Sequence, residues 1–101
     1  MSKGLVMFST SLSTENLEKT REIMKERRVV MNLTQKEAAE KTGVNIRTLQ
    51  HLEQKGEISF LNLLKLMSVY RMDERVMKGI EDRSWWTIEQ LERAEKRKRA
   101  R

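Results

Sequence analysis

Twenty consecutive positions, residues 35–54, constrain this chain more than any other feature, because their side chains suit two helices that cross at a tight turn. Helices that cross at about 90–120° need small residues where their backbones approach. Ala39 lies in the middle of the first expected helix, and Gly43 lies at the turn, where glycine adopts a positive φ without strain. Leu49 and Leu52 face inward from the second helix, and the outward positions are polar. The pattern predicts a helix-turn-helix.

Helix-start signals repeat along the rest of the chain. In the fullest of them, Thr34 and Glu37 can each accept a hydrogen bond from the other's backbone N–H. Glycines follow two expected helix ends, at positions 43 and 56, where a left-handed cap favours them. We therefore expect an all-α chain with five packed helices between about residues 13 and 81. The reduced start signals lie near residues 13, 45, 59, 73 and 87.

The expected fourth helix carries an apolar stripe that should face the core. The stripe is predicted to contain Phe60, Leu63, Leu64 and Met67, with Leu61 outside it. Core filling is also the favoured role for the methionines that fall at helical spacings, at positions 24, 31, 67, 72 and 77.

Two shorter regions flank the packed domain, which is expected to span residues 13–82. Residues 1–12 form an N-terminal arm, either disordered or a strand that pairs with its copy in a dimer. Residues 83–101 form a basic C-terminal helical tail with Glu-to-Lys/Arg pairs four residues apart. Because Trp85 and Trp86 precede this helix, the tail is either a solvated helix or an arm that docks or binds phosphate.

The positive charge is concentrated in that tail. The 101 residues carry a net charge of +6. The last nine contain six Lys or Arg and one Glu, which is +5 and leaves +1 for the other residues. A basic chain is drawn to a polyanion, and nucleic acid is the usual one. The nearly neutral domain must recognise its partner through specific contacts.

Several function classes are disfavoured by what the sequence lacks. Without cysteine there is no disulfide or thiolate site, and the single histidine, His51, cannot hold zinc alone. The longest apolar runs have four residues, whereas a bilayer-spanning helix needs about 20. The four glycines are isolated, so no glycine-rich phosphate loop occurs. We expect no catalytic site, metal or cofactor, no membrane association, and a cytoplasmic, nucleoid-associated protein.

The segment LTQKEAAEKTGVNIRTLQHLEQKGEIS resembles the helix-turn-helix of the Xre/Cro family of phage-repressor-like regulators. The similarity extends from about Met24 to Val76, and it implies a five-helix phage-repressor-like domain that binds double-stranded DNA. It implies that Gln35 touches a phosphate and that Arg28 and Glu53 form a bracing ion pair. The chain departs from the family pattern in a longer link before Gly56 and in Ile58, where many members have proline. The matching positions are Leu33-Thr34-Gln35, Ala39, Gly43-Val44, Leu49 and Leu52-Glu53.

Residue chemistry favours the same assignment for the second helix, whose first turn is the part that enters a major groove. Arg47 can donate to both O6 and N7 of guanine, and Ile46 suits a thymine methyl group. Gln50 can read adenine or bind phosphate, and His51 can donate a hydrogen bond to a base or to a phosphate. The remaining candidates are Asn45 on the same helix and the phosphate-binding set Thr34, Gln35, Lys36 and Lys55.

These features lead to one principal expectation and two alternatives. The principal one is a sequence-specific transcriptional regulator, a repressor that acts as a homodimer on a palindromic operator. The ending ERAEKRKRAR resembles tails of Xre-type regulators paired with HipA-like kinases. It favours, as an alternative, an antitoxin that neutralises a kinase-like toxin and autoregulates its operon. A structural DNA-binding protein without sequence preference is the third reading.

Overall fold

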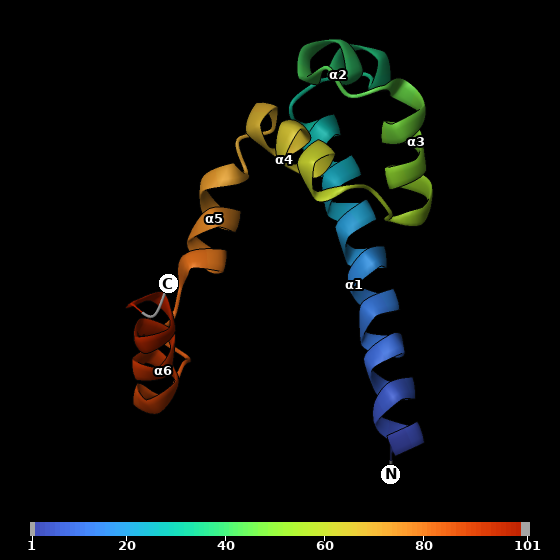
Figure 1. Ribbon diagram of the computed structural model, residues 1–101. Coiled ribbons are helices and arrows are strands. Elements are labelled where there is room, and N and C mark those ends of the chain that lie inside the picture. The colour runs from blue at the N-terminus through green and yellow to red at the C-terminus, as the bar shows by residue number, and fades with distance from the viewer. Residues whose placement is uncertain (1, 100–101) are drawn as a thin grey trace.

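The computed structural model describes the backbone of residues 2–99 and the side chains of residues 13–99, and its regular elements are all helices (Figure 1). The predicted all-α class and the helix-turn-helix domain are therefore confirmed. None of the described helices combines the length and apolarity needed to cross a bilayer. The elements in chain order are α1 (Ser2–Val30), α2 (Gln35–Thr42), α3 (Ile46–Lys55), α4 (Phe60–Val69), α5 (Asp73–Glu81) and α6 (Ile88–Arg99).

The first helix is longer than the sequence signals predicted. It begins at Ser2 rather than near Ser13, so residues 2–12 have helical backbone where a disordered arm or a dimer strand was expected. A cap at Ser13 requires a non-helical residue before it, but residues 5–12 contain neither proline nor glycine to interrupt a helix. Extending an existing helix costs far less than nucleating one, so local start signals alone do not fix this boundary.

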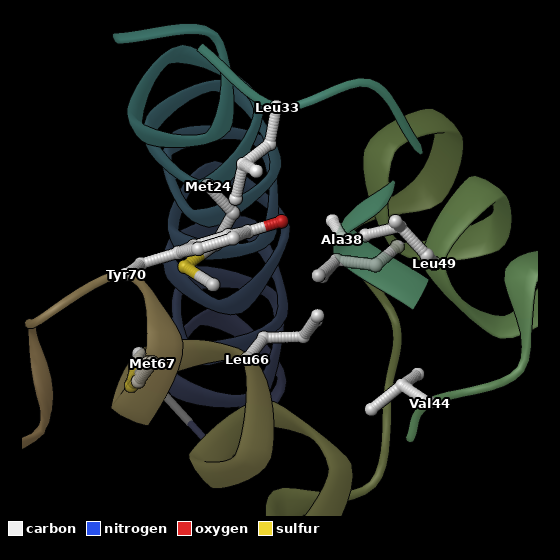
Figure 2. Close-up of a cluster of buried hydrophobic side chains, with 9 residues drawn as sticks. Met24, Leu33, Ala38, Val44, Leu49, Leu66, Met67 and Tyr70 are labelled. Atoms are coloured by element: carbon white, nitrogen blue, oxygen red, sulfur yellow. The ribbon is translucent and has the colours of Figure 1, made fainter. Parts of the chain in front are cut away.

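The C-terminal half of α1 is the element around which the domain packs. It contacts α3, while α2 packs against both α3 and α4, and α5 packs against α4 (Figure 1). Met24 of α1, Leu49 of α3 and Leu66 of α4 supply almost completely buried side chains to one core. Figure 2 shows the core side chains of these elements converging, with Ala38 of α2 and the Tyr70 ring among them. The helix-turn-helix is thus held on the scaffold of α1 and α4.

The core face of α4 differs from the predicted stripe. Phe60 is 55% exposed, whereas Leu66 and Tyr70 are fully buried and Met67 nearly so. The true stripe is Leu63, Leu66, Met67 and Tyr70, which has the i, i+3, i+4, i+7 spacing of one helix face. Apolar residues occur on several faces of this helix, so the pattern allowed two phases. Leu61 is exposed, as predicted.

Caps and turns hold the motif helices at their expected ends. The Thr34 hydroxyl accepts from the Glu37 N–H at 3.1 Å, and the Glu37 carboxylate accepts from the Thr34 N–H at 3.0 Å. Gly43 has a φ of 76° at the end of α2. Gly56 has the same φ at the end of α3, and a Cβ there would also collide with the backbone carbonyl of Leu17 in α1. Close backbone approach therefore requires glycine at 56, and the turn conformation alone favours it at 43.

The two ends of the chain extend away from this packed region. None of the extensive helix–helix contacts involves α6, which follows a connector spanning residues 82–87 (Figure 1). The radius of gyration is 17.5 Å, whereas a compact chain of this length has about 13 Å. Trp85 and Ile88 are 74% and 76% exposed. The predicted tail is helical over residues 88–99, and it does not dock extensively on its own domain.

Candidate nucleic-acid interface

A buried ion pair braces the motif from behind. Arg28 of α1 donates from Nε and Nη2 to the two carboxylate oxygens of Glu53 in α3, at 2.7 and 2.9 Å. Its Nη1 donates to the Leu33 carbonyl at 2.9 Å. The hydrogen bonds that Arg28 donates to Glu53 raise the pKa of Arg28 against the opposing effect of burial, so the guanidinium stays charged. The expected pair therefore ties α1, the turn before α2, and α3 together.

The same carboxylate orients the start of α2. The Gln35 side-chain amide donates to Oε1 of Glu53 at 3.1 Å, and the Gln35 side-chain oxygen accepts from Gln50 at a long 3.5 Å. Gln35 and Gln50 are both partly buried. These bonds occupy the two glutamine side chains within the protein. The Gln35 backbone N–H, at the first position of α2, belongs to a helix N-terminus, which is a feature that can bind an anion.

The first turn of α3 presents its side chains outward. The Asn45 side-chain oxygen accepts from the Arg47 N–H at 2.8 Å and so caps the helix. Ile46 is 37% exposed and Arg47 is also exposed, while Leu49 and Leu52 on the opposite face are fully buried. The helix therefore has one face committed to the core and one turn of solvent-facing side chains that a groove can admit.

His51 and the lysines flank this turn at the surface. The side chain of His51 is 54% exposed, and its Nε2 lies 3.0 Å from the carboxylate of Glu57 in the α3–α4 loop. Lys36 and Lys55 are exposed, as is Thr34, whose hydroxyl oxygen already caps α2. Glu57 was not expected near the site. Its negative charge opposes phosphate, so the His51 and Glu57 side chains must separate if His51 is to contact DNA.

Two residues that sequence reasoning did not single out support this arrangement. Tyr70 is fully buried at the end of α4, and burial raises its pKa to about 12, so the phenol remains neutral. Its hydroxyl has no hydrogen-bond partner among the described residues. Arg27 donates from Nε to the Tyr70 carbonyl at 2.8 Å and fixes the end of α4 to α1. The only sequence signal for Tyr70 was its spacing from Leu63, which lies seven residues earlier on the same stripe.

The two alanines of α2 differ in burial. Ala38 is completely buried, whereas Ala39, expected at the closest approach, is partly exposed. The turn is further tied by Thr42, whose hydroxyl donates to the Ala38 carbonyl and accepts from the Val44 N–H. Among the residues whose side chains are described, no group of acidic or histidine side chains has the arrangement of a metal site.

Comparison with known proteins agrees with this geometry. The helix-turn-helix family matches residues 24–76, which is more than half of the chain and includes α2, α3 and the elements that brace them. No curated protein and no solved structure gives a significant match. The braced motif, its outward first turn and this match together show that the chain belongs to the helix-turn-helix family of Xre/Cro type, whose members are DNA-binding transcription regulators.

Proposed function

We propose that this regulator is a sequence-specific repressor that binds a palindromic operator as a homodimer, with α3 in the major groove. The observation that carries the proposal is the outward first turn of α3, held by its Asn45 cap and by the buried Glu53–Arg28 pair. A reading helix must be fixed within a small angular range if its side chains are to meet base edges. The Asn45 cap at the start of α3 and the Glu53 brace near its end restrict its orientation.

Base recognition is assigned to the exposed side chains of this turn. Arg47 donates to guanine O6 and N7, and Ile46 packs against a thymine methyl group. Gln50 and His51, one turn further along, reach a base edge or the adjoining phosphate. Gln50 must exchange its long contact with Gln35 for one with DNA, which costs little at 3.5 Å.

Phosphate contacts are assigned to the groups around the start of α2 and the end of α3. The backbone N–H groups at the start of α2 and the hydroxyl of Thr34 lie at the positive end of a helix dipole. The ammonium groups of Lys36 and Lys55 add two exposed charges. Such contacts set register and carry no sequence information, so specificity depends on the first turn of α3.

The size and charge of one domain support a dimer. A single α3 of ten residues reads only a few base pairs, and residues 1–92 carry a net charge of only +1. Two copies related by a two-fold axis double the contacts and place the half-sites about 34–36 Å apart on the duplex. The proposal therefore includes a palindromic operator with that spacing.

Replacing Arg47 with alanine tests the assignment. Operators selected from random DNA by the full-length protein are first used to find the preferred guanine in each half-site. Arg47→Ala should weaken operator binding by about 1–3 kcal/mol per half-site and relax the preference at that guanine. Lys78→Ala is the matched control, because it removes one exposed positive charge from α5, which packs against α4 and not α3. Unchanged base preference in Arg47→Ala, or an equal loss in the control, contradicts the assignment.

An antitoxin role is a second candidate, and the exposed tail favours it. Trp85 and Ile88 expose about three-quarters of their surface on a segment that makes no extensive contact with the domain. The Trp86 indole N–H is buried without a hydrogen-bond partner among the described residues, and four basic residues occupy the last turn of α6. An acidic, partly apolar groove on a kinase-like toxin would complement this segment.

Deleting residues 84–101 tests the second candidate. Co-purification with the product of the adjacent gene should be lost, while operator binding should be largely retained because α1–α5 remain complete. A variant that keeps the two tryptophans but converts the basic residues 96–99 to glutamine distinguishes apolar docking from charge attraction. If the truncated protein retains the partner, or if the full-length protein does not capture it, the antitoxin role is rejected.

A further inference from the structure

A pocket lies on the side of the domain formed by the end of α1, the α4–α5 turn and the first part of α5. Its volume is about 270 Å³, and it is lined by Arg27, Arg71, Met72, Arg75 and Val76. None of these residues belongs to α2 or α3. In Figure 1, α5 extends from α4 on the side of α1 opposite to α3, so the pocket is separate from the proposed reading face.

Three arginines line this pocket without carboxylate partners. Arg27 is oriented by its Nε bond to the Tyr70 carbonyl, which leaves its two terminal nitrogens for another acceptor. No described carboxylate lies within ion-pair distance of Arg27, Arg71 or Arg75. The acids that begin α5, Asp73 and Glu74, do not line the pocket. Neighbouring like charges repel, so the arrangement is one that a bound anion stabilises.

The backbone at Arg71 is a second, independent observation. Arg71 has a φ of 58°, in the left-handed region that favours glycine after a helix. The turn closes through a bond from the Met72 N–H to the Met67 carbonyl at 2.8 Å. The other non-glycine residue with positive φ in the described chain is Asn32, a type that tolerates this conformation. An arginine at position 71 is therefore disfavoured by its backbone conformation, and this arginine is one of the residues that line the pocket.

The chemistry of the lining narrows the class of ligand. A guanidinium group can donate two parallel hydrogen bonds to the oxygens of a phosphate. Three positive charges also suit a ligand with two negative charges, such as a phosphate, better than a ligand with one carboxylate. Met72 and Val76 add an apolar wall for a small organic group. The volume is slightly below the range of about 300–1,000 Å³ that drug-sized ligands occupy. We propose that this pocket binds a small phosphorylated molecule, at a site distinct from the DNA interface.

Nuclear magnetic resonance titration of the full-length protein with phenyl phosphate, at constant ionic strength, tests the proposal. Saturable shifts are expected in the side-chain Nε–H signals of Arg27 and Arg75 and in the Met72 methyl signal. Arg71→Gly removes one guanidinium and relieves the left-handed backbone. It should keep or raise the melting temperature while weakening phenyl phosphate binding about tenfold.

Two further variants separate binding in the pocket from general surface attraction. Arg75→Gln removes a second guanidinium from an exposed position and should also weaken binding about tenfold. Arg97→Gln, in the tail, removes an equal charge far along the chain from the pocket and should leave binding unchanged. Shifts that do not saturate, that persist in Arg71→Gly and Arg75→Gln, or that weaken equally in Arg97→Gln overturn the proposal. Displacement of phenyl phosphate from the same signals by a short non-operator duplex also overturns it, because the pocket would then serve the DNA backbone.

Discussion

The region spanning residues 24–76 and the two helical ends of the chain are both α-helical, but they are held in different ways. In the central region, short helices of eight to ten residues have capped ends, buried leucines and a buried ion pair. At the C-terminal end, α6 has an exposed ion pair between Glu89 and Arg93 and no buried residue among those described. Central helices are therefore stabilised by tertiary packing, and α6 by local sequence alone.

This difference separates the helices that form the folded domain from α6, which is available for other interactions. Helices of fewer than about 12–15 residues are marginal in isolation, so α2 and α3 depend on the core. The twelve residues of α6 lack that support but retain favourable Glu-to-Arg spacing. The structure thus combines a packed recognition unit with an appended helix that makes no extensive contact with the described domain.

The two ion pairs should show the largest difference in stability between the central region and α6. Glu53→Ala leaves the buried Arg28 guanidinium without its carboxylate, and we expect the free energy of unfolding to fall by about 3–5 kcal/mol. Glu89→Ala removes an exposed pair in α6 and should cost at most about 0.5 kcal/mol. Urea denaturation followed by circular dichroism measures both. Equal losses would mean that the two regions are stabilised alike.

Replacing one leucine in each region with alanine compares how much packing contributes to the stability of the central region and of α6. Leu49 is fully buried in α3, so Leu49→Ala should destabilise the protein by about 2–5 kcal/mol through lost burial and a residual cavity. Leu91 is 37% exposed in α6, and Leu91→Ala should cost less than about 0.5 kcal/mol. The readout is the midpoint of chemical denaturation at equal protein concentration. A large loss in Leu91→Ala would show that α6 packs on something in solution, either the domain or a second copy.

The smallest expected effect concerns two exposed carboxyls. Hydrogen bonds from the backbone N–H groups of Thr34 and Ser84 lower the pKa of Glu37 and Asp82, respectively. A carboxyl whose pKa is lower in the folded state than in the unfolded chain stabilises the fold at pH values above the unfolded pKa. This contribution is lost as the pH falls through the folded pKa. Because Glu37 caps a core helix and Asp82 lies in the connector, only the first should affect global unfolding.

Melting temperatures measured between about pH 6 and pH 3 test this expectation. Glu37→Gln should reduce the acid-induced loss of stability, and Asp82→Asn should leave it intact. If Asp82→Asn flattens the profile as much as Glu37→Gln does, the connector unfolds together with the domain, and the division between the regions is incorrect.

The central region was also the part that the sequence predicted well, because several independent signals agreed there. The Thr34–Glu37 capping box, the glycines at 43 and 56, and the inward Leu49 and Leu52 each favoured the same two helices. Each signal is local or follows a single helical period, so it can be read without knowledge of the rest of the chain. Agreement among such signals is what a foldable sequence is expected to show.

The sequence predictions were wrong where the start of a helix, or the choice of its buried face, depends on tertiary structure. The start of α1 has no local stop signal, and the stripe of α4 could be drawn through Phe60 or through Leu66 because both are apolar. The contact between His51 and Glu57 joins α3 to the loop that follows it, and the pocket near Arg71 is formed by three segments of the chain. No periodicity within one helix encodes such neighbours.

The contact between Gly56 and the Leu17 carbonyl has a consequence for altering specificity. The main chains of α3 and α1 approach closely at the far end of α3, so this contact adds a backbone constraint on the tilt of α3 to the one that the Arg28–Glu53 pair supplies. Ile46 and Arg47 lie at the opposite end of α3, ten and nine residues before Gly56. If the proposed base contacts hold, exchanging Ile46 and Arg47 should change which bases are preferred while the docking angle is conserved. A methyl group at position 56 should instead shift α3 and change the orientation of all the proposed base-contacting side chains together.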